Sequence, residues 1–323
     1  MGEFKKILGI LNHCKFFLII LLILAVAGYL FYLTTPPNGF PIDRIISIEE
    51  GESIKSTSLI LKEEKIIRSS IYFQLLVQFS EAKSIMAGDY LFDKEMNIFE
   101  VVKKIETGTF DVPNIKITIT EGMTVRDIAT RLNGKLVNFN PQSFMKLATK
   151  YEGYLFPDTY QFNYNADEFK VIEAMRNNFN QKMLVIKNEI AESGKNLDDI
   201  ITMASIVEKE ATKDTIDEVT DVLWNRINKE MPLQVDATFV YSIGKHSFDV
   251  TKLEMQDENN PYNTYAHTGL PPTPISNPGL ESIMASINHR PTDYVFFLTG
   301  RDGEMYFATT FEEHKRNRYL YLD

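Results

Sequence analysis

The sequence predicts an α+β protein with a single N-terminal transmembrane helix, small repeated αβ modules and a larger mixed α+β domain around a central buried helix. Three observations lead to this prediction: an uncharged apolar run near the N-terminus, a repeat offset by 71 residues, and a mostly apolar helix at 200–211. The 323 residues give room for two or three domains. Apolar content of 44% and charged content of 24% are ordinary for a folded protein.

Charge and residue usage exclude several classes of function. The net charge of −10 argues against a nucleic-acid partner, and no basic stripe interleaved with aromatic residues occurs. Cys14 is the only cysteine, which excludes an internal disulfide and a cysteine-based metal site. The five histidines show no ligand spacing. The sequence therefore predicts no metal and no other cofactor.

The N-terminal segment is predicted to cross a membrane once. Residues 16–33 form an uncharged apolar run long enough to span a bilayer as a helix. Lysines precede the run, so residues 1–15 are expected to be a cytoplasmic tail with everything beyond Thr34 outside. A cleaved signal peptide is the alternative, because Ala25-Val26-Ala27 resembles a cleavage site. Residues 34–41, with three prolines and a glycine, are predicted to be a stiff linker.

Residues 42–139 contain the internal repeat. The segment ISIEEGESIKSTSLIL from Ile46 aligns with ITITEGMTVRDIATRL from Ile117. Each copy predicts a short alternating strand, a turn at glycine, and a helix capped by Ser53 or Thr124. A similar unit lies between them, with AGDYLF as strand and turn and IFEVVKKI as a helix capped by an asparagine.

The pattern of a strand, E-G-x-[ST]-[IV] and a helix resembles LysM-like modules, which recognise N-acetylated sugars in cell-wall glycans. This resemblance implies that residues 42–139 bind glycan. The alternative is that these units only hold the distal domain at a fixed height above the membrane, since a fold does not establish a function. Both interpretations place the modules outside the cell.

The helix predicted at 200–211 begins after Asn196, which can accept a hydrogen bond from a free backbone N–H of the first turn. At 100° per residue its apolar side chains cover most of the circumference. Thr202, Ser205 and Lys209 are left on a narrow polar strip. This distribution predicts a buried helix.

Two carboxylates, Glu208 and Glu210, fall within the apolar arc of this helix. Burial raises the pKa of a carboxyl group, and a carboxylic acid that is protonated near neutral pH is what a general acid requires. The alternative is that each glutamate lies at the edge of the arc or pairs with a lysine or arginine. The small residues Ala204 and Ser205 leave room for a substrate beside Glu208.

The rest of the distal domain, 140–323, is predicted to mix helices with a hairpin. Six aromatic residues between Tyr151 and Tyr164 are typical of a core, with stacking on sugar rings as the alternative. The segment LQVDATFVYSIG from Leu233 is predicted to be an extended strand with Gln234 and Asp236 on one face. Helical spacing predicts helices at about 166–192, 214–231, 279–288 and 314–318, and YVFFLTG with MYFAT predicts a hairpin that turns at 301–303.

The segment NPYNTYAHTGLPPTPISNPG, Asn260 to Gly279, predicts a long ordered loop, because it holds five prolines and two glycines. Loops of this length in a compact domain are usually functional. Its uncharged hydrogen-bonding groups suit sugar hydroxyls and acetamides: Tyr262, Asn263, Thr264, Tyr265, Ser276 and Asn277.

Four segments together resemble the YceG-like (MltG) family of endolytic murein transglycosylases: EGYLFPDTY at Glu152, ASIVEKEA at Ala204, LQVDATFVY at Leu233, and the loop from Asn260. The resemblance covers about Ile42 to the C-terminus. It implies a membrane-anchored enzyme with LysM-like modules and a YceG-like catalytic domain at 140–323, which cleaves nascent peptidoglycan within the glycan strand. It implies Glu208 as the catalytic residue and cleft-lining loops at Asn263 to Tyr265 and Pro271 to Gly279. From these loops and the segments above, the residues predicted to bind substrate are Glu152, Gln234, Asp236, Tyr262, Asn263, Thr264, Tyr265, Ser276 and Asn277.

One glutamate is sufficient for the lytic reaction that this resemblance implies. Glu210 leaves the helix axis about 200° around from Glu208 and cannot be its partner. Glu208 would protonate the oxygen leaving C1 of N-acetylmuramic acid (MurNAc), then take the proton of the C6 hydroxyl as that oxygen closes onto C1. The product is a 1,6-anhydroMurNAc end, and positioning the internal nucleophile supplies an entropic advantage.

Other functions stay open on the sequence alone. A hydrolytic muramidase would use Asp236, Glu152 or Asp158 as a second carboxylate. A non-catalytic peptidoglycan-binding scaffold would recruit peptidoglycan synthases through its cytoplasmic tail. A secretion or transporter anchor is neither supported nor excluded by a single span. The expected partners are peptidoglycan glycan strands and the bacterial cytoplasmic (inner) membrane.

Overall fold

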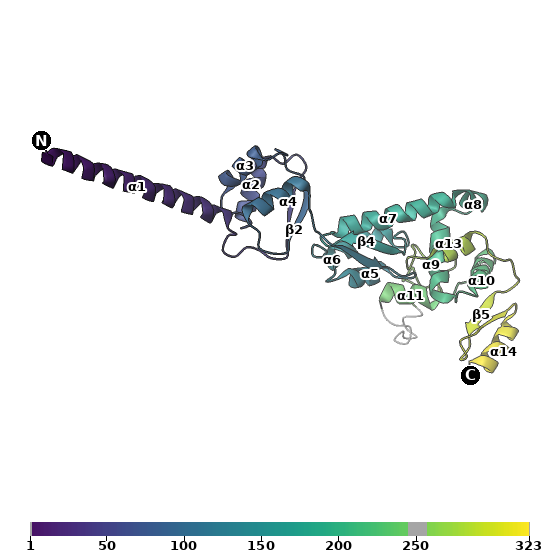
Figure 1. Cartoon of the computed structure of the whole chain (residues 1–323). Coiled ribbons are helices and arrows are strands. Elements are labelled where there is room, and N and C mark those ends of the chain that lie inside the picture. The colour runs from purple at the N-terminus through teal and green to yellow at the C-terminus, as the bar shows by residue number, and fades with distance from the viewer. Residues whose placement is uncertain (1, 245–256, 323) are drawn as a thin grey trace. The chain divides into compact units, whose positions relative to one another are not determined.

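The computed structural model describes residues 2–244 and 257–322, with side chains from Lys15 onward (Figure 1). The chain divides into two compact units, Met1–Pro113 and Asn114–Asp323. Helices and three two-stranded antiparallel sheets occur in the described residues, which confirms the mixed α+β class.

The first unit begins with one long helix, α1 (Gly2–Thr34). Its stretch Lys15–Thr34 has a mean hydropathy of 2.8 and is long and apolar enough to cross a membrane, a property that an anchor and a signal sequence share. After it come the remaining elements of the unit: β1 (Arg44–Ile48), α2 (Ile54–Glu63), α3 (Ser70–Phe79), β2 (Gly88–Phe92) and α4 (Ile98–Thr107).

Strand β1 pairs antiparallel with β2, with Ile46 opposite Tyr90. Alternate residues of β1 are buried, so one face of the pair packs on the helices while the other faces solvent. The predicted caps are confirmed: Ser53 accepts a hydrogen bond from the backbone of α2, and Asn97 forms a capping box with α4. The core of this unit is therefore a small helix layer on a two-stranded sheet.

The second unit begins with the second copy of the repeat. Strand β3 (Asn114–Thr118) leads through a turn at Gly122, where φ is +73°, into α5 (Val125–Leu132), and Thr124 caps this helix as predicted. Strand β3 pairs with β4 (Thr159–Asn163). This pairing reaches across α6 (Pro141–Ala148) and the short 3₁₀ helix η1 (Thr149–Tyr151), and the second compact unit accordingly includes the second copy of the repeat from Asn114 on.

Helices form the centre of the second unit: α7 (Glu168–Val185), α8 (Lys187–Glu192), α9 (Leu197–Glu210), α10 (Ile216–Asn228) and α13 (Leu280–Ile287). Every residue of α9 from Ile200 to Val207 is buried, and α9 packs against α10 and α13. Asn196 caps α9 by accepting from Asp199 N at 2.7 Å. The single helix expected over 166–192 is interrupted at Ile186, whose buried side chain packs into the core below α9.

The strand expected from Leu233 is wrong for most of its length, because Asp236–Ile243 forms helix α11. Gln234 has φ of +52°, which interrupts the extended backbone one residue before Val235 leads into the helix. The backbone N–H of Ala237 donates to Glu210, so a carboxylate caps the first turn of the helix. A short apolar run does not distinguish strand from helix, and here the tertiary partners decide.

The C-terminal part agrees with the sequence-based predictions. The hairpin of β5 (Phe296–Thr299) and β6 (Met305–Ala308) is present, and α14 (Phe311–Tyr321) is a solvated helix with no buried residue. From residue 257 to Gly279 the chain forms no helix and only one isolated bridge, between Thr268 and Pro232. The expected long ordered loop is confirmed for these residues.

Candidate active site

Glu208 lies in the last turn of α9, where the helix leaves the core, and its side chain is half-buried. Its Oε2 accepts a hydrogen bond from the backbone N–H of Gly279 at 3.0 Å and one from Ser282 Oγ at 2.8 Å. Gly279 caps α13, so this oxygen lies at the positive end of that helix. No group of the described residues bonds Oε1, which leaves one oxygen of a fixed carboxyl group for a ligand.

Gly279 also separates Glu208 from a second carboxylate, that of Glu121. A Cβ atom on Gly279 would lie 2.1 Å from Glu121 Oε1, although the backbone of Gly279 itself, at φ −75°, would accept any residue. Burial raises the pKa of Glu121, and the charges of Glu208 and Glu281 add to this effect while Lys213 opposes it. Glycine at this position therefore allows two acidic side chains to approach the same backbone segment.

The turn at Gly122 brings Glu121 to the end of α9. A Cβ atom on Gly122 would lie 3.4 Å from Glu208 Cγ, so the turn passes close over the glutamate. Lys209 Nζ donates to the carbonyl of Gly122 at 3.3 Å. The repeat that was predicted as a glycan-binding module thus contributes its glutamate and glycine to the surroundings of Glu208.

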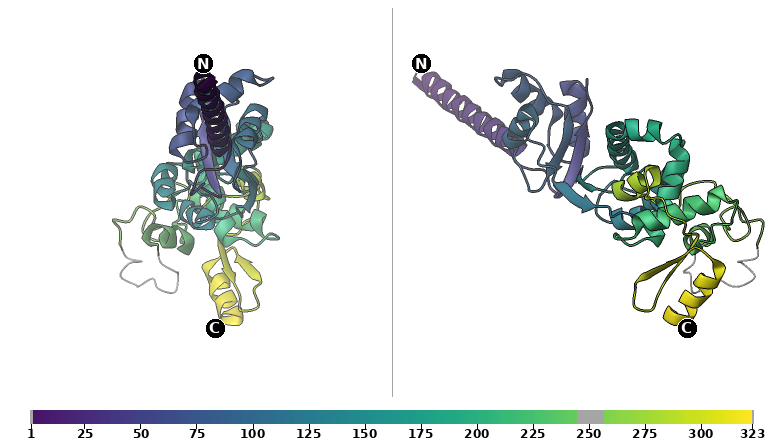
Figure 2. Two further views of the ribbon diagram at one scale, coloured as in Figure 1. Left: turned by 60° about the vertical axis from the view of Figure 1, so that its left-hand side comes forward. Right: turned by 90° about the vertical axis from the view of Figure 1, so that its right-hand side faces the viewer.

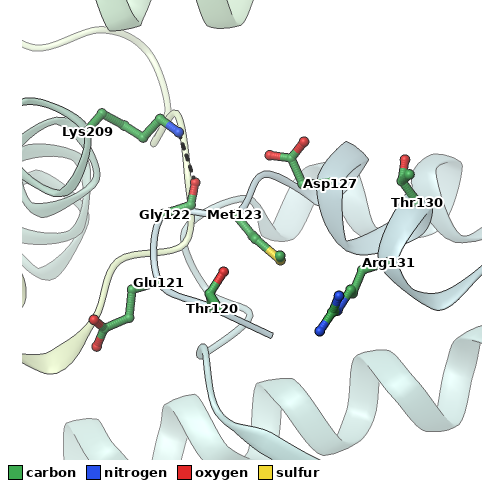
Figure 3. Close-up of a pocket in the computed structure, with 8 residues that line it drawn as sticks. All are labelled: Thr120, Glu121, Gly122, Met123, Asp127, Thr130, Arg131 and Lys209. Carbon is green, nitrogen blue, oxygen red and sulfur yellow. Dashed lines mark hydrogen bonds between the residues drawn. The ribbon is translucent and has the colours of Figure 1, made fainter. Parts of the chain in front are cut away.

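A pocket of about 490 Å³ opens beside this turn, a volume within the range of small-ligand sites. Figure 3 shows Lys209 and Glu121 on one side of the backbone at Gly122 and the α5 side chains on the other. The pocket wall combines both charges with hydroxyl groups: Thr120, Glu121, Gly122, Met123, Asp127, Thr130, Arg131 and Lys209.

Polar groups of the long loop form hydrogen bonds with α9 and with the turn at Gly122. Ser276 Oγ donates to the carbonyl of Ser205 at 3.0 Å, and Ser205 Oγ accepts from the N–H of Ile275 at 3.0 Å. The backbone of Asn277 exchanges hydrogen bonds with Gly122 and Met123 at 2.9 and 3.0 Å. These bonds place Gly279 over Glu208.

Glu152 is buried at 5% exposure and joins three segments. Its carboxylate accepts from the N–H of Val125 at 3.1 Å, from Asn277 Nδ2 at 2.9 Å and from the hydroxyl of Tyr241 at 3.3 Å. Burial raises the pKa of the Glu152 carboxyl to about 7, although these three donors act in the opposite direction.

The raised pKa predicts a pH-dependent stability. The folded protein holds the Glu152 proton more tightly than the unfolded chain, so this stabilisation is complete below pH 4.5 and is lost as the pH rises to about 7. Glu152→Gln has a neutral side chain of the same shape at every pH. We expect the free energy of unfolding of this variant, relative to that of wild type, to increase by roughly 2 to 3 kcal/mol as the pH rises across that window. Urea unfolding of the full chain in detergent, followed by the fluorescence of the only tryptophan, Trp224, measures it at pH 5 and 8. Equal pH dependence in both proteins would refute this prediction.

A separate acidic cluster surrounds the start of α11. Tyr265 donates its hydroxyl to Asp236 Oδ1 at 2.6 Å, and Glu210 accepts from the backbone of Ala237 beside them. Burial raises the pKa of Glu210 to about 6, with the charge of Asp236 adding to the effect. Glu210 is therefore bonded within the protein, on a different part of the surface of α9 from Glu208.

The nine predicted substrate-binding residues differ in exposure. Gln234 and Asp236 are exposed, and Tyr262 and Tyr265 are half-buried. The remaining five are buried at 5% exposure or less and use polar groups within the protein: Glu152, Asn263, Thr264, Ser276 and Asn277. Exposed groups can contact a polysaccharide directly, whereas these buried groups fix the loops.

Of the residues that contact or border Glu208, Glu121 and Ser282 are absent from the sequence-based prediction of the site, and Gly279 is in it only as the last residue of the long loop. In the sequence, Glu121 stands out only as part of the E-G repeat, and Ser282 belongs to an ordinary helix. The combination of small or polar residues at a helix start, N-P-G-L-E-S, is a signal for an anion-accepting helix N-terminus that could have identified the last two.

Comparison with known proteins identifies the family of this chain. The chain matches the model of the YceG-like family over residues 46–319. An endolytic murein transglycosylase of Bacillus subtilis is 32% identical over 305 residues, covering 86% of this chain and 84% of that protein. One of Streptococcus pneumoniae R6 is 27% identical over 350 residues; the match covers 93% of this chain but only 63% of the pneumococcal protein.

A solved structure shares the fold. The crystal structure of a YceG-like protein from Listeria monocytogenes superimposes with a TM-score of 0.56 at 30% identity, covering 84% of this chain and 98% of the other. The matched region, residues 46–319, includes the repeat, the Glu208 helix, the long loop and the hairpin. The chain belongs to the YceG-like family.

Proposed function

We propose that this protein is a membrane-anchored endolytic murein transglycosylase. It cleaves the bond between MurNAc and N-acetylglucosamine (GlcNAc) within nascent glycan strands and so ends strand elongation. The proposal depends on the position of Glu208: a half-buried carboxyl group with one oxygen fixed by Gly279 and Ser282 and the other unbonded by the described residues. Its relatives carry the name endolytic murein transglycosylase.

In the first step, protonated Glu208 donates its proton from Oε1 to the oxygen that leaves C1 of MurNAc, and the C1–O bond breaks. The carboxylate that forms stays bonded through Oε2 to Gly279 N–H and Ser282 Oγ, which stabilise its charge at the N-terminus of α13. The carboxylate then accepts the proton of the C6 hydroxyl as O6 bonds to C1. Glu208 ends protonated, the strand carries a 1,6-anhydroMurNAc end, and no water is consumed.

Substrate contact is assigned by exposure. We place the glycan against the exposed and half-buried residues Gln234, Asp236, Tyr262 and Tyr265. The buried residues Glu152, Asn263, Thr264, Ser276 and Asn277 hold the loop and the Gly122 turn in place. In this assignment the buried residues affect cleavage indirectly: they fix the position of Gly279, and Gly279 positions Glu208.

The N-terminal part anchors the enzyme and adds glycan contacts in this proposal. The stretch Lys15–Thr34 of α1 spans the cytoplasmic membrane, with the tail inside and the catalytic domain outside. Residues 42–139 act as LysM-like modules, which the two strand–turn–helix copies support. The second copy packs within the catalytic unit and supplies Glu121.

The products of digestion test the proposed chemistry. Purified glycan strands incubated with the full-length protein are expected to yield fragments with anhydro ends, which are lighter than hydrolysed reducing ends by one water molecule. Mass spectrometry of the fragments separates the two outcomes. A protein that bound sacculi without releasing fragments would be a scaffold and would end the enzyme proposal.

Hydrolysis is the second candidate, and one observation favours it. Glu121 is a second carboxylate beside Gly279, whose N–H bonds Glu208, and the charge of Glu208 acts on it. A muramidase needs a second carboxylate to activate water. Reducing ends in the digest that are lost in Glu121→Gln would assign this role to Glu121.

A further inference from the structure

Helix α3 exposes an apolar stripe although it is part of a folded unit. Its ten residues, SIYFQLLVQF, include no charge. Phe73 and Val77 are fully buried in the core, whereas Ile71, Leu75 and Phe79 on the opposite face are 70%, 44% and 83% exposed. Spacing by four residues places these three side chains in one row along the helix. Contiguous exposed apolar side chains of this kind mark an interaction surface.

Hydrogen bonds from Arg68 connect the start of α3 to the end of the candidate membrane span. Arg68, two residues before the helix, donates to the hydroxyl of Tyr32 at 2.7 Å and to the carbonyl of Pro36 at 2.6 Å. Its guanidinium group also lies 4.2 Å from the centre of the Tyr32 ring. Because Tyr32 belongs to the last turns of the apolar stretch Lys15–Thr34, α3 begins at the level where that stretch ends.

The exposed stripe lies on the face of α3 that is turned away from the core of the first unit. Figures 1 and 2 show the helix layer of α2 and α3 on the α1 side of the strand pair, with the strands behind it. The stripe is on the face of α3 opposite its core residues Phe73 and Val77, and therefore away from the strands. On the neighbouring helix α2, Lys55, Leu59 and Lys62 are exposed at spacings of four and three residues, and the exposed Glu63 lies next to Leu59 on the same face.

We propose that this face of the first unit lies on the outer surface of the membrane in which α1 is inserted. Ile71, Leu75 and Phe79 enter the boundary between headgroups and acyl chains, and the lysines of α2 meet anionic lipid phosphates. This combination of an apolar row with a basic flank is that of an interfacial helix. The inference rests on the proposed membrane anchor, and it adds a second point of attachment that fixes which face of the unit meets the lipid.

Depth-dependent quenching tests this placement. The full-length protein with Cys14→Ser is reconstituted into vesicles of phosphatidylcholine and phosphatidylglycerol, with a single cysteine at position 79 carrying an environment-sensitive fluorophore. The matched control carries the label at Ser47, which is exposed on the strand face opposite the helices. We expect lipids with a nitroxide in the acyl chain to quench the label at 79 at least several-fold more than the label at 47.

The only protein in the vesicles is this chain, and a high lipid-to-protein ratio keeps its copies apart. Equal quenching at both positions, or none at 79, would therefore overturn the inference. Flotation of the vesicles after alkaline extraction separates this result from a failure of the anchor. Protein that floats without quenching at 79 refutes only the interfacial face, whereas protein that is extracted refutes the anchor and this inference together. With the label moved to position 75, Phe79→Glu is expected to reduce its quenching towards that of the label at 47 while α1 still holds the protein in the vesicle.

Discussion

Glu208→Gln is expected to abolish strand cleavage, with a loss of at least roughly 10²- to 10⁴-fold in turnover, because one group performs both the acid and the base step. The amide oxygen of glutamine can still accept the hydrogen bonds of Gly279 N–H and Ser282 Oγ, so the local structure is retained. The amide nitrogen cannot deliver a proton to the leaving oxygen. Release of soluble fragments from purified glycan strands, normalised to folded protein, measures the effect.

Glu210→Gln is the matched control for this experiment. Glu210 lies in the same turn of α9 and its raised pKa of about 6 arises from burial, yet its carboxylate bonds the backbone of Ala237. We expect its cleavage rate to stay within a few-fold of wild type, with any change limited to stability. Normal turnover by a folded Glu208→Gln variant, or an equal loss in both variants, would remove Glu208 from the mechanism.

Local chemistry made most elements predictable from the sequence. The caps at Ser53, Thr124 and Asn196 depend on a side chain and the backbone within three residues of it, and each is present. The pairing of β3 with β4 joins segments about forty residues apart, and no local pattern specifies it. The run from Leu233 forms helix α11, and the hydrogen bond between its first turn and Glu210 joins segments that are distant in the sequence.

In the candidate site, too, the features that depend on local sequence were predictable and those that depend on tertiary contacts were not. Helical periodicity predicted a buried helix, and α9 is buried from Ile200 to Val207. Thr202 and Ser205, expected on a polar strip, are buried at 5% and 0%, and the loop at Ile275 and Ser276 forms hydrogen bonds with Ser205. The proximity of Glu121 to Glu208 could not be predicted from the sequence, since only the tertiary fold brings the repeat to the end of α9.

Gly279→Ala is expected to lower kcat/KM by about 10²-fold without unfolding the protein. The backbone at Gly279 suits alanine, but the new methyl group would lie 2.1 Å from Glu121 Oε1 and 2.4 Å from its carbon Cδ. Either Glu121 is expelled or the start of α13 moves, and the second displaces the N–H that holds Glu208. A misplacement of about 1 Å at a catalytic group costs about this factor. Steady-state kinetics with a defined glycan strand measures it.

The combination of Gly279→Ala with Glu121→Ala shows which movement matters. In the double variant the methyl group has space, so we expect its kcat/KM to equal that of Glu121→Ala alone, a complete lack of additivity. If the loss in the double variant equals the product of the two single losses, the methyl group acts on something other than Glu121.

Ser282→Ala removes one hydrogen bond to Glu208 and adds no volume. We expect it to lower kcat/KM only about tenfold, as the loss of one hydrogen bond to a charged group does. Gly279→Ala and Ser282→Ala both act within one turn of α13. The ratio of their losses in kcat/KM therefore reports how strictly Oε2 of Glu208 must be held for Oε1 to transfer a proton.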